Sequence, residues 1–559
     1  EYWESVMTDR IWADKYPEGV SQEISYDKYS TVIDVFNDSC KRFATLPAYS
    51  NLGVTITYQQ LNELSADFAA YLEHHTNLKK GDRIAVQMPN LIQFPIVVFG
   101  AMRAGLVVVN TNPMYTAREM EHQFNDSGAK ALVALANFGD LVEKVVPKTG
   151  VETVIITQVA DMHKPLKRAA MNFAIKKLKK MVPEFNIPGA IPFTKALKLG
   201  KKATFDPSHA PSGDDLAVLQ YTGGTTGVAK GAMLTHKNLV SNMLQMKSIL
   251  TSFEDGKEVM ISPLPMYHIF AFTVGCLAMM ETGAHNVLIT NPRDIPAFIE
   301  EMSKWKFTAV TGLNTLFVAM LNNKEFHNLD FSALKITVAG GMALQKAAAD
   351  DWEKATGVQV CEGYGMTETS PVISVNLPSN IQIGTIGIPL PATDVKLLDD
   401  DENEVALGER GELCVKGPQV MKGYWQRPEA TQETMTKDGE WLKTGDVAVF
   451  QEDGFLKIVD RIKDMILVSG FNVYPNEIED VVCSHAEIVE AAAIGIPDEK
   501  SGEAVKVFIV SNTNTLTKEQ VVAYCKANMT GYKVPRHVEF RDELPKSNVG
   551  KILRRELRD

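Results

Sequence analysis

The stretch LAVLQYTGGTTGVAKGAMLTH, residues 216–236, places an apolar run beside a loop that is rich in glycine and threonine. The run LAVLQ (216–220) predicts a strand, and HKNLVSNMLQM (236–246) predicts a helix. The loop between them, YTGGTTGVAKG (221–231), is therefore expected to follow a strand and to precede a helix. Phosphate groups are often bound at such a position.

The composition of this loop is typical of a phosphate-binding site. Glycines let the backbone approach an anion and point its amides at it, threonine hydroxyls add donors, and Lys230 adds charge. A Walker A loop is excluded, because Val228 and Ala229 separate Gly227 from Lys230 where that motif needs contiguous residues. A flexible turn is the plainer alternative, but turns rarely combine this many hydroxyls and glycines with a lysine.

Short apolar runs alternate with helix-like stretches on both sides of the loop, and this alternation predicts parallel α/β sheets. The runs before the loop are RIAVQMPN (83–90), LVVVNTNP (106–113), ALVALA (131–136) and TVIIT (153–157). The runs after it are EVMISPLP (258–265), NVLIT (286–290), FTAVTG (307–312) and KITVAGG (335–341). Two layered α/β subdomains are therefore expected, at about 1–215 and 216–380.

The rest of the chain has a different pattern of predicted strands and turns. From about Gly384, short strands and turn signals predict a β-rich subdomain over 381–459, which would complete a large N-terminal domain (1–459). The segment DRIKD (460–464) is the expected linker. Beyond it, residues 465–559 predict a small α+β domain.

The composition excludes several classes of protein. A net charge of −12 argues against a general nucleic-acid binder, so an anionic ligand must meet local cations. The 6 cysteines form no CxxC pair, which favours reduced thiols and a cytoplasmic location over disulfides or a zinc site. The longest apolar runs, 94–102 and 269–280, fall short of the ~18–20 residues that a membrane-spanning helix needs. The first residues lack the apolar segment of a secretory signal, and Met7 could be the natural start.

Two further clusters could carry chemistry. In CEGYGMTETS (361–370), Tyr364 could stack on a base, Thr367 could bond a phosphate and Glu368 could hold Mg²⁺, a hard cation that prefers carboxylate oxygen. A tyrosine-glycine turn before a capped helix is an equally good account of this cluster alone. In LPKSNVGKILRRELRD (544–559), Lys551 lies on a polar loop, where a solvated lysine is the plainer interpretation.

Taken together, the motifs resemble those of the acyl-adenylate-forming (ANL) superfamily. The glycine-rich loop, Tyr-Gly-x-Thr-Glu, WLKTGD (441–446), DRIKDMILVSGFNVYPNEIE (460–479) and PKSNVGK (545–551) follow one another in that superfamily's order and spacing. Longer strings, including ITNPRDIP and GPQVMKGYWQRPEAT, are most similar to bacterial long-chain fatty acyl-CoA ligases. The resemblance implies a large adenylation domain, whose β-rich part is a distorted barrel, and a mobile C-terminal lid domain.

The resemblance also implies an enzyme that uses ATP and Mg²⁺ to activate long-chain fatty acids as CoA thioesters through acyl-AMP. The implied catalytic residues are Lys551, Glu368, His268 and Thr367, with Glu368 as the metal ligand. The implied ATP-binding residues are Tyr221, Thr222, Gly223, Gly224, Thr225, Thr226, Gly227, Lys230, Gly341, Gly363, Tyr364, Asp446 and Arg461. Lys463 would be the hinge of the lid, Gly470 would border the CoA channel and Phe272 would line the acyl pocket. Candidates for the CoA phosphates are Lys533, Arg536, Arg554 and Arg555, for each of which a solvated charge is the plainer account.

Other functions remain open at this point. The chain could pass its acyl group to a carrier protein, could ligate aryl acids, or could be a non-catalytic peripheral membrane protein for fatty-acid uptake. The segment KPLKRAAMNFAIKKLKKMVP (164–183) has seven basic residues and no acid, with Leu166, Ala170, Phe173, Leu178 and Met181 near one helical face. Such a helix could contact the inner membrane from the cytoplasmic side. The oligomeric state is open, and a homodimer is one option.

Overall fold

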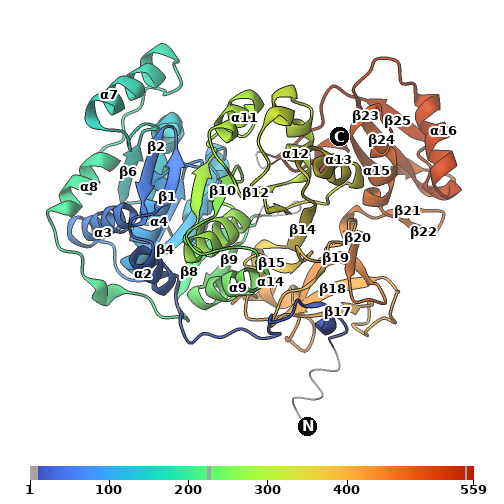
Figure 1. Cartoon of the computed structure of the whole chain (residues 1–559), viewed down its shortest axis with the longest axis horizontal. Coiled ribbons are helices and arrows are strands. Elements are labelled where there is room, and N and C mark those ends of the chain that lie inside the picture. Colours follow the sequence, from blue (N-terminus) through green and yellow to red (C-terminus); the bar gives the residue numbers. More distant parts are fainter. Residues whose placement is uncertain (1–9, 223–227, 548–549, 559) are drawn as a thin grey trace, which may run out of the picture.

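The structure is a computed structural model that describes residues 10–222, 228–547 and 550–558. The described residues form four β-sheets with helices packed around them (Figure 1). Two large sheets lie in the N-terminal part, a smaller one follows, and a fourth lies at the C-terminal end. This arrangement agrees with the α/β class expected from the sequence.

The first large sheet has seven strands in the order β7-β6-β5-β3-β4-β8-β9. All neighbours are parallel except β8 and β9, which run antiparallel. Every residue of β4 and β5 is buried, which explains why these strands are continuous apolar runs in the sequence. The strands are β3 Arg83–Gln87, β4 Val107–Thr111, β5 Ala131–Leu135, β6 Thr153–Thr157, β7 Ile191–Pro192, β8 Leu216–Tyr221 and β9 Gly231–Thr235.

The second large sheet has nine strands in the order β16-β15-β14-β13-β12-β10-β11-β1-β2. One hydrophobic core contains residues of both large sheets, so the two α/β layers form one body. The strands are β1 Pro47–Asn51, β2 Val54–Thr57, β10 Val259–Ser262, β11 His285–Leu288, β12 Ala309–Gly312, β13 Ile336–Ala339, β14 Val360–Gly365, β15 Val372–Val375 and β16 Ile388–Pro389.

The predicted boundary near residue 215 does not separate the two sheets. Strands β8 and β9 lie after it but belong to the first sheet, because β8 pairs in parallel with β4. Strands β1 and β2 lie before it but belong to the second sheet, because β1 pairs in parallel with β11. Apolar runs indicate where strands form, but the partner of a parallel strand depends on packing across the whole body.

The helices of the body begin at recognisable signals. Thr31, Thr57, Thr116 and Thr235 each form a capping box, in which the threonine and the side chain three residues later bond each other's backbone amides. The helices of the N-terminal body are α2 Val32–Arg42, α3 Tyr58–His75, α4 Gln93–Arg103, α5 Ala117–Ser127, α6 Gly139–Val145, α7 Pro165–Phe173, α8 Phe193–Lys201, α9 His236–Ile249, α10 Met279–Glu281, α11 Ile295–Ser303, α12 Asn314–Leu321 and α13 Lys346–Thr356.

The β-rich region is a four-stranded antiparallel sheet, β17-β18-β19-β20, formed by β17 Asp394–Leu398, β18 Gly411–Lys416, β19 Leu442–Phe450 and β20 Leu456–Arg461, with α14 Pro428–Glu433 beside it. A distorted barrel is expected here from the family resemblance, but β17 and β20 lie at opposite edges of this sheet. The edge of β20 is instead continued by backbone hydrogen bonds between Leu456 and residues 386–387. The N-terminal segment crosses this region, where Arg10 donates to Asp394 at 2.7 Å.

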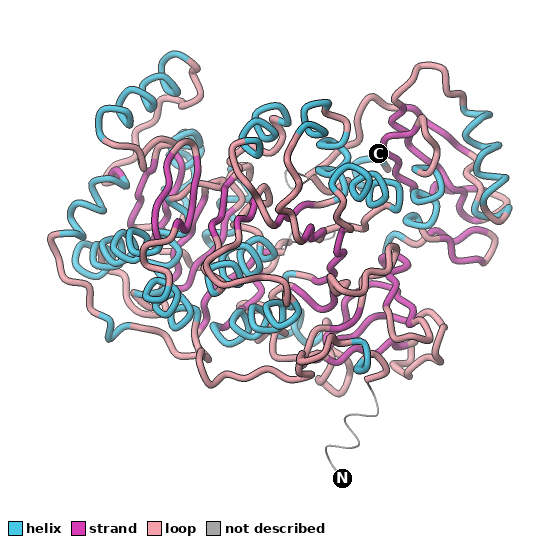
Figure 2. The backbone as a smooth tube through the Cα atoms, in the orientation of Figure 1, coloured by secondary structure: helices cyan, strands magenta, loops and turns pink. Residues whose placement is uncertain are grey.

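The C-terminal part is a small α+β unit, as expected (Figure 2). Its sheet pairs β23 with β24 over a long antiparallel register, and β25 runs parallel to β24. Its elements are β21 Ile466–Val468, β22 Phe471–Val473, α15 Pro475–Cys483, β23 Ile488–Asp498, β24 Gly502–Ser511, α16 Lys518–Asn528, β25 His537–Phe540 and α17 Arg554–Leu557. We call residues 465–558 the lid.

The basic segment 164–183 stands out from the body at one end of the molecule (Figure 1). It is not one regular helix: α7 ends at Phe173, and a π-helical turn, Ala174–Leu178, follows. Leu166 is 89% exposed and Leu178 is 74% exposed, and Phe173 and Met181 are also exposed. Within the described part of the chain, no helix is long and apolar enough to cross a membrane.

Candidate active site

The glycine-rich loop connects the antiparallel strands β8 and β9, and their pairing holds its two ends together. The Thr222 amide donates to the Lys230 carbonyl at 2.9 Å, and Tyr221 lies opposite Gly231 in the strand register. The Tyr221 hydroxyl donates to Asp126 at 2.6 Å, which anchors the start of the loop to α5. The predictions for Gly223, Gly224, Thr225, Thr226 and Gly227 concern residues outside the described ranges and stay predictions.

The helix predicted after this loop is confirmed, but a strand that the sequence analysis did not predict lies between the loop and the helix. Strand β9 comes first, and α9 begins after it at His236, with Thr235 as its cap. Ala232 and Leu234 are fully buried, so the residues after the loop extend the first sheet rather than start a helix. A strand of five residues next to a glycine-rich loop has too few alternations to be recognised from the sequence.

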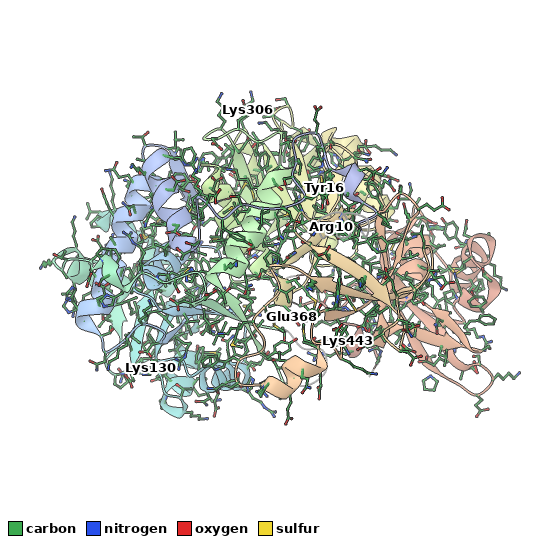
Figure 3. All side chains as sticks on the ribbon, turned by 90° about the horizontal axis from the view of Figure 1, so that it is seen from below. Arg10, Tyr16, Lys130, Lys306, Glu368 and Lys443 are labelled. Atoms are coloured by element: carbon green, nitrogen blue, oxygen red, sulfur yellow. The ribbon has the colours of Figure 1, made fainter. Side chains whose placement is uncertain are left out.

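Glu368 lies in a short turn after β14, near the middle of the molecule (Figure 3). It is 8% exposed, and its carboxylate accepts a hydrogen bond from the Tyr424 hydroxyl at 2.6 Å. Burial raises the pKa of Glu368, while the bond from Tyr424 and the nearby charge of Lys230 oppose that rise. The Lys230 ammonium lies 4.8 Å from the centre of the Tyr424 ring. Thr367, the neighbour of Glu368, is half-buried.

Tyr424 is the residue of this group that the sequence reasoning missed. It lies in GPQVMKGYWQRPEAT, a string that carried the family resemblance but received no role. Its hydroxyl and its ring join the candidate metal ligand Glu368 to Lys230. The only sequence signal for Tyr424 was the order lysine-glycine-tyrosine in that string, and this order does not indicate which residues the tyrosine contacts.

A second group lies where β14 meets the β-rich sheet. The hydroxyl of Tyr364 donates to the Asp446 carboxylate, and Asp446 lies opposite Arg461 in the pairing of β19 with β20. Burial raises the pKa of Asp446, whereas the bond from Tyr364 and the charges of Arg461 and Lys463 lower it. These contacts bring three of the predicted ATP-binding residues together.

Lys551 extends from the lid toward the N-terminal body. A Cβ placed on Gly341, whose φ is +83°, would lie 3.7 Å from the Lys551 Cε. Burial, with a contribution from the charge of Arg461, lowers the pKa of Lys551 to about 8. A Cβ on Gly363 would likewise make only ordinary contacts, and Gly363 lacks the positive φ of Gly341. The lid is therefore docked with Lys551 beside the candidate nucleotide site.

His268 lies on the same side of the site as Lys551. It is half-buried, and burial together with the charge of Lys551 lowers its pKa to about 3. The imidazole is therefore neutral at neutral pH, so it can accept or donate a hydrogen bond but adds no positive charge.

Phe272 lies four residues after His268, in a π-helical stretch, Ala271–Ala278, and is 1% exposed. Ala271 and Gly275 of this stretch line a cavity of about 10 Å³, room for about one water molecule. Most of the cavity wall is apolar and includes Met260, Leu264, Met266 and Leu288. Phe272 is not one of the residues that line this cavity, so its role in an acyl pocket stays a prediction.

The predicted hinge residue lies in the linker before the lid, and the predicted channel residue lies in a turn of the lid. Lys463 is exposed in a short turn, Ile462–Asp464, between β20 and β21. Gly470, with φ +81°, forms the turn between β21 and β22, and a Cβ there would meet open space. Arg554 is not free to bind a CoA phosphate, because it pairs with the buried Glu479 at 2.6 Å.

These groups together suit a nucleoside triphosphate. Lys230, Arg461 and Lys551 supply positive charge, and Tyr364 and Asp446 offer a ring and a hydrogen-bond acceptor. In the described residues, no three histidine, cysteine or acidic side chains gather into a metal cluster. The single buried carboxylate of Glu368 fits Mg²⁺, which commonly binds one or two carboxylates plus the phosphates of a substrate.

Comparisons with known proteins show the family of the chain. The family model "AMP-binding enzyme" matches residues 36–425, and "AMP-binding enzyme C-terminal domain" matches residues 477–551. The chain is 54% identical over 553 residues to a long-chain-fatty-acid–CoA ligase of Salmonella typhimurium, with 98% of each chain covered. ATP-bound MatB from Rhodopseudomonas palustris has a similar structure, with a TM-score of 0.80 at 27% identity over 94% of this chain and 98% of that chain. The apo form of that protein gives 0.71 at 27% identity over 95% and 98%. A match across most of both the body and the lid shows that the chain belongs to the AMP-binding enzyme family.

Proposed function

We propose that this chain joins long-chain fatty acids to CoA in two steps at one site. The fatty acid carboxylate first attacks the α-phosphate of ATP, which gives acyl-AMP and releases pyrophosphate. The CoA thiol then attacks the acyl carbon and releases AMP. The observation that carries the proposal is the docking of Lys551 beside Gly341 and His268, in a chain 54% identical to a ligase of this name.

In the first step both reactants are anions, so the barrier falls mainly through charge neutralisation and alignment. Lys230 holds the outer phosphates, and Lys551 lies against the α-phosphate and the attacking carboxylate. Tyr364 lies against the adenine, and Asp446 with Arg461 holds the ribose. Glu368 and Thr367 would hold Mg²⁺ and its phosphates, and the ion supplies further neutralisation of the phosphate charge when bound.

The second step needs the thiol at the place that Lys551 has filled. We assign Lys463 as the hinge about which the lid turns, with residues 460–464 as the linker. The turn at Gly470 would then border the pantetheine chain of CoA, where the absence of a Cβ leaves room. The higher TM-score to the ATP-bound form of MatB than to its apo form supports the assignment of the present lid position to the first step.

A fatty-acid chain-length series with ATP and Mg²⁺ tests the function, with pyrophosphate and thioester followed separately, with and without CoA. We expect thioester only with CoA, and a rate that rises from medium to long chains, because each buried methylene contributes about 0.8 kcal/mol. Pyrophosphate without thioester would indicate a carrier-protein acceptor. A preference for aryl acids would indicate an aryl-CoA ligase, and fatty-acid binding without turnover would indicate a non-catalytic uptake protein.

The segment 164–183 is the proposed contact with an anionic membrane surface on the cytoplasmic side. Its exposed apolar side chains, Leu166, Phe173, Leu178 and Met181, lie among basic residues, a combination suited to anionic lipid. The six cysteines are all free thiols, which supports a reducing compartment. A homodimer stays an untested expectation that light scattering would decide.

Flotation with vesicles tests this contact. The double variant Leu166→Ser with Leu178→Ser should bind vesicles of anionic lipid several-fold more weakly than the unaltered chain. Leu407→Ser is the matched control, since Leu407 is 55% exposed in another part of the molecule. Equal binding of all three proteins, or equal binding to zwitterionic vesicles, would contradict the assignment.

A further inference from the structure

We infer that Thr315 is a positioning residue for the adenylation step, because its hydroxyl fixes the loop that carries Lys551. The Thr315 Oγ1 donates to the Gly550 carbonyl at 2.8 Å. This bond joins the N-terminal body to the lid, directly before Lys551. The inference rests on the proposed role of Lys551 and adds a residue of the body that holds it in place.

Thr315 is held rigidly on the body. It is the second residue of α12, which follows β12 of the second sheet, and it is 9% exposed. The side chain of its neighbour Asn314 accepts from the Gln345 amide at 2.9 Å, which ties the start of α12 to the start of α13. A threonine hydroxyl near a helix start often bonds its own helix, but here the only described partner of this donor is the lid.

The loop of Lys551 packs directly on the start of α12. A Cβ on Gly550 would lie 2.8 Å from the Thr315 Oγ1 and 3.2 Å from a Leu313 methyl group, so only glycine fits there without displacement. Gly550 also has φ +86°, which disfavours other residues. The close approach and the hydrogen bond place the Gly550 carbonyl at one point on the body.

Two hydrogen bonds between Ser547 and Lys551 hold the backbone next to Gly550. The Ser547 amide donates to the Lys551 carbonyl at 2.7 Å, and the Lys551 amide donates to the Ser547 hydroxyl at 3.2 Å. These bonds leave the backbone of Lys551 little freedom relative to Gly550. The lysine stem then reaches the position beside Gly341.

Other contacts between the lid and the body involve α15 and the residue before it, and those named here do not touch this loop. The Lys346 amide donates to Asp480 of α15 at 3.2 Å. Arg410 donates to Glu477 at 2.9 Å, and its guanidinium lies 4.6 Å from the Tyr474 ring centre. These contacts tether α15, so they can keep the lid near the body without fixing Lys551.

Thr315→Val tests the inference, because it keeps the shape of the side chain and removes the donor. We expect single-turnover pyrophosphate release to fall about tenfold, since the Gly550 carbonyl loses its partner and Lys551 loses its fixed position. Transfer from supplied acyl-AMP to CoA should be unchanged, because Lys551 has left the site in that step. Thr315→Ser should restore adenylation, and Arg410→Met should change it less than Thr315→Val.

Hydrogen exchange of the peptide that contains Lys551, measured with bound ATP analogue, adds a readout that needs no fatty acid. Exchange should be faster in Thr315→Val than in Thr315→Ser, with the same unfolding temperature for both. Unchanged exchange, unchanged adenylation, or an equal loss in both half-reactions would each overturn the inference. A failure of the unaltered chain to form acyl-AMP from any fatty acid would instead overturn the proposed function.

Discussion

The body and the lid each contribute a lysine to the site, and they hold it in different ways. Lys230 lies directly before β9, in the loop between two paired strands of the first sheet, with its carbonyl bonded to Thr222 and its ammonium against the Tyr424 ring. Lys551 comes from the lid, and its loop meets the body through Gly550 and Thr315. A group built into a sheet stays in place through a reaction, whereas a group on a docked unit can be withdrawn. The two lysines should therefore differ in which half-reactions depend on them.

The largest expected effect is that of Lys551→Ala. Adenylation should fall on the order of 10³-fold, because a cation at the reacting phosphate is lost, while transfer from supplied acyl-AMP to CoA is spared. Stopped-flow detection of pyrophosphate and of thioester separates the two. Lys546→Ala is the matched control, since Lys546 pairs with Glu490 inside the lid at 2.7 Å and should change either step little. Equal losses in both steps for Lys551→Ala would contradict the expected difference between the two lysines.

Asp446→Ala should give a smaller but broader effect. Asp446 belongs to the body and bonds Tyr364, and its proposed partner is the ribose, which remains in acyl-AMP. Both half-reactions should fall by about 10- to 100-fold, mainly through weaker nucleotide binding. Kinetics at varied ATP and at varied acyl-AMP would show this as a raised KM in each. An effect confined to adenylation would mean that Asp446 behaves like a lid residue.

The smallest of these expected effects near neutral pH is that of pH on the kcat/KM for adenylation. Burial lowers the pKa of Lys551 to about 8, so its charge is present below that pH and is lost above it. The kcat/KM for adenylation should therefore fall about tenfold per pH unit above about 8, whereas transfer should lack this fall. Arginine stays charged at all these values, so Lys551→Arg should remove the fall even if its rate is lower. A fall that persists in Lys551→Arg would assign it to another group.

The sequence predicted where strands form better than it predicted which strands pair with each other. The apolar runs at 83–90 and 335–341 became strands, because burial on both faces leaves a local pattern. The pairing of β1 with β11 left no such pattern, so the two sheets were divided at the wrong place. Glycine, lysine and tyrosine motifs indicated Lys551 and Tyr364, whereas Tyr424 and Thr315 were missed. Each of these two residues makes one hydrogen bond from its hydroxyl to a group that is distant in the sequence. Such a contact leaves no pattern in a single sequence.

The interleaved sheets also affect how the chain is made. Ser50 of β1 bonds His285 of β11 across 235 positions, and Arg10 bonds Asp394 across 384. A ribosome adds about 5–20 residues per second, so on the order of 10–50 s pass between the synthesis of β1 and that of β11. The N-terminal body therefore cannot mature one layer at a time during translation. A fragment that ends at residue 215 would lack β8 from one sheet and leave β1 and β2 without the other.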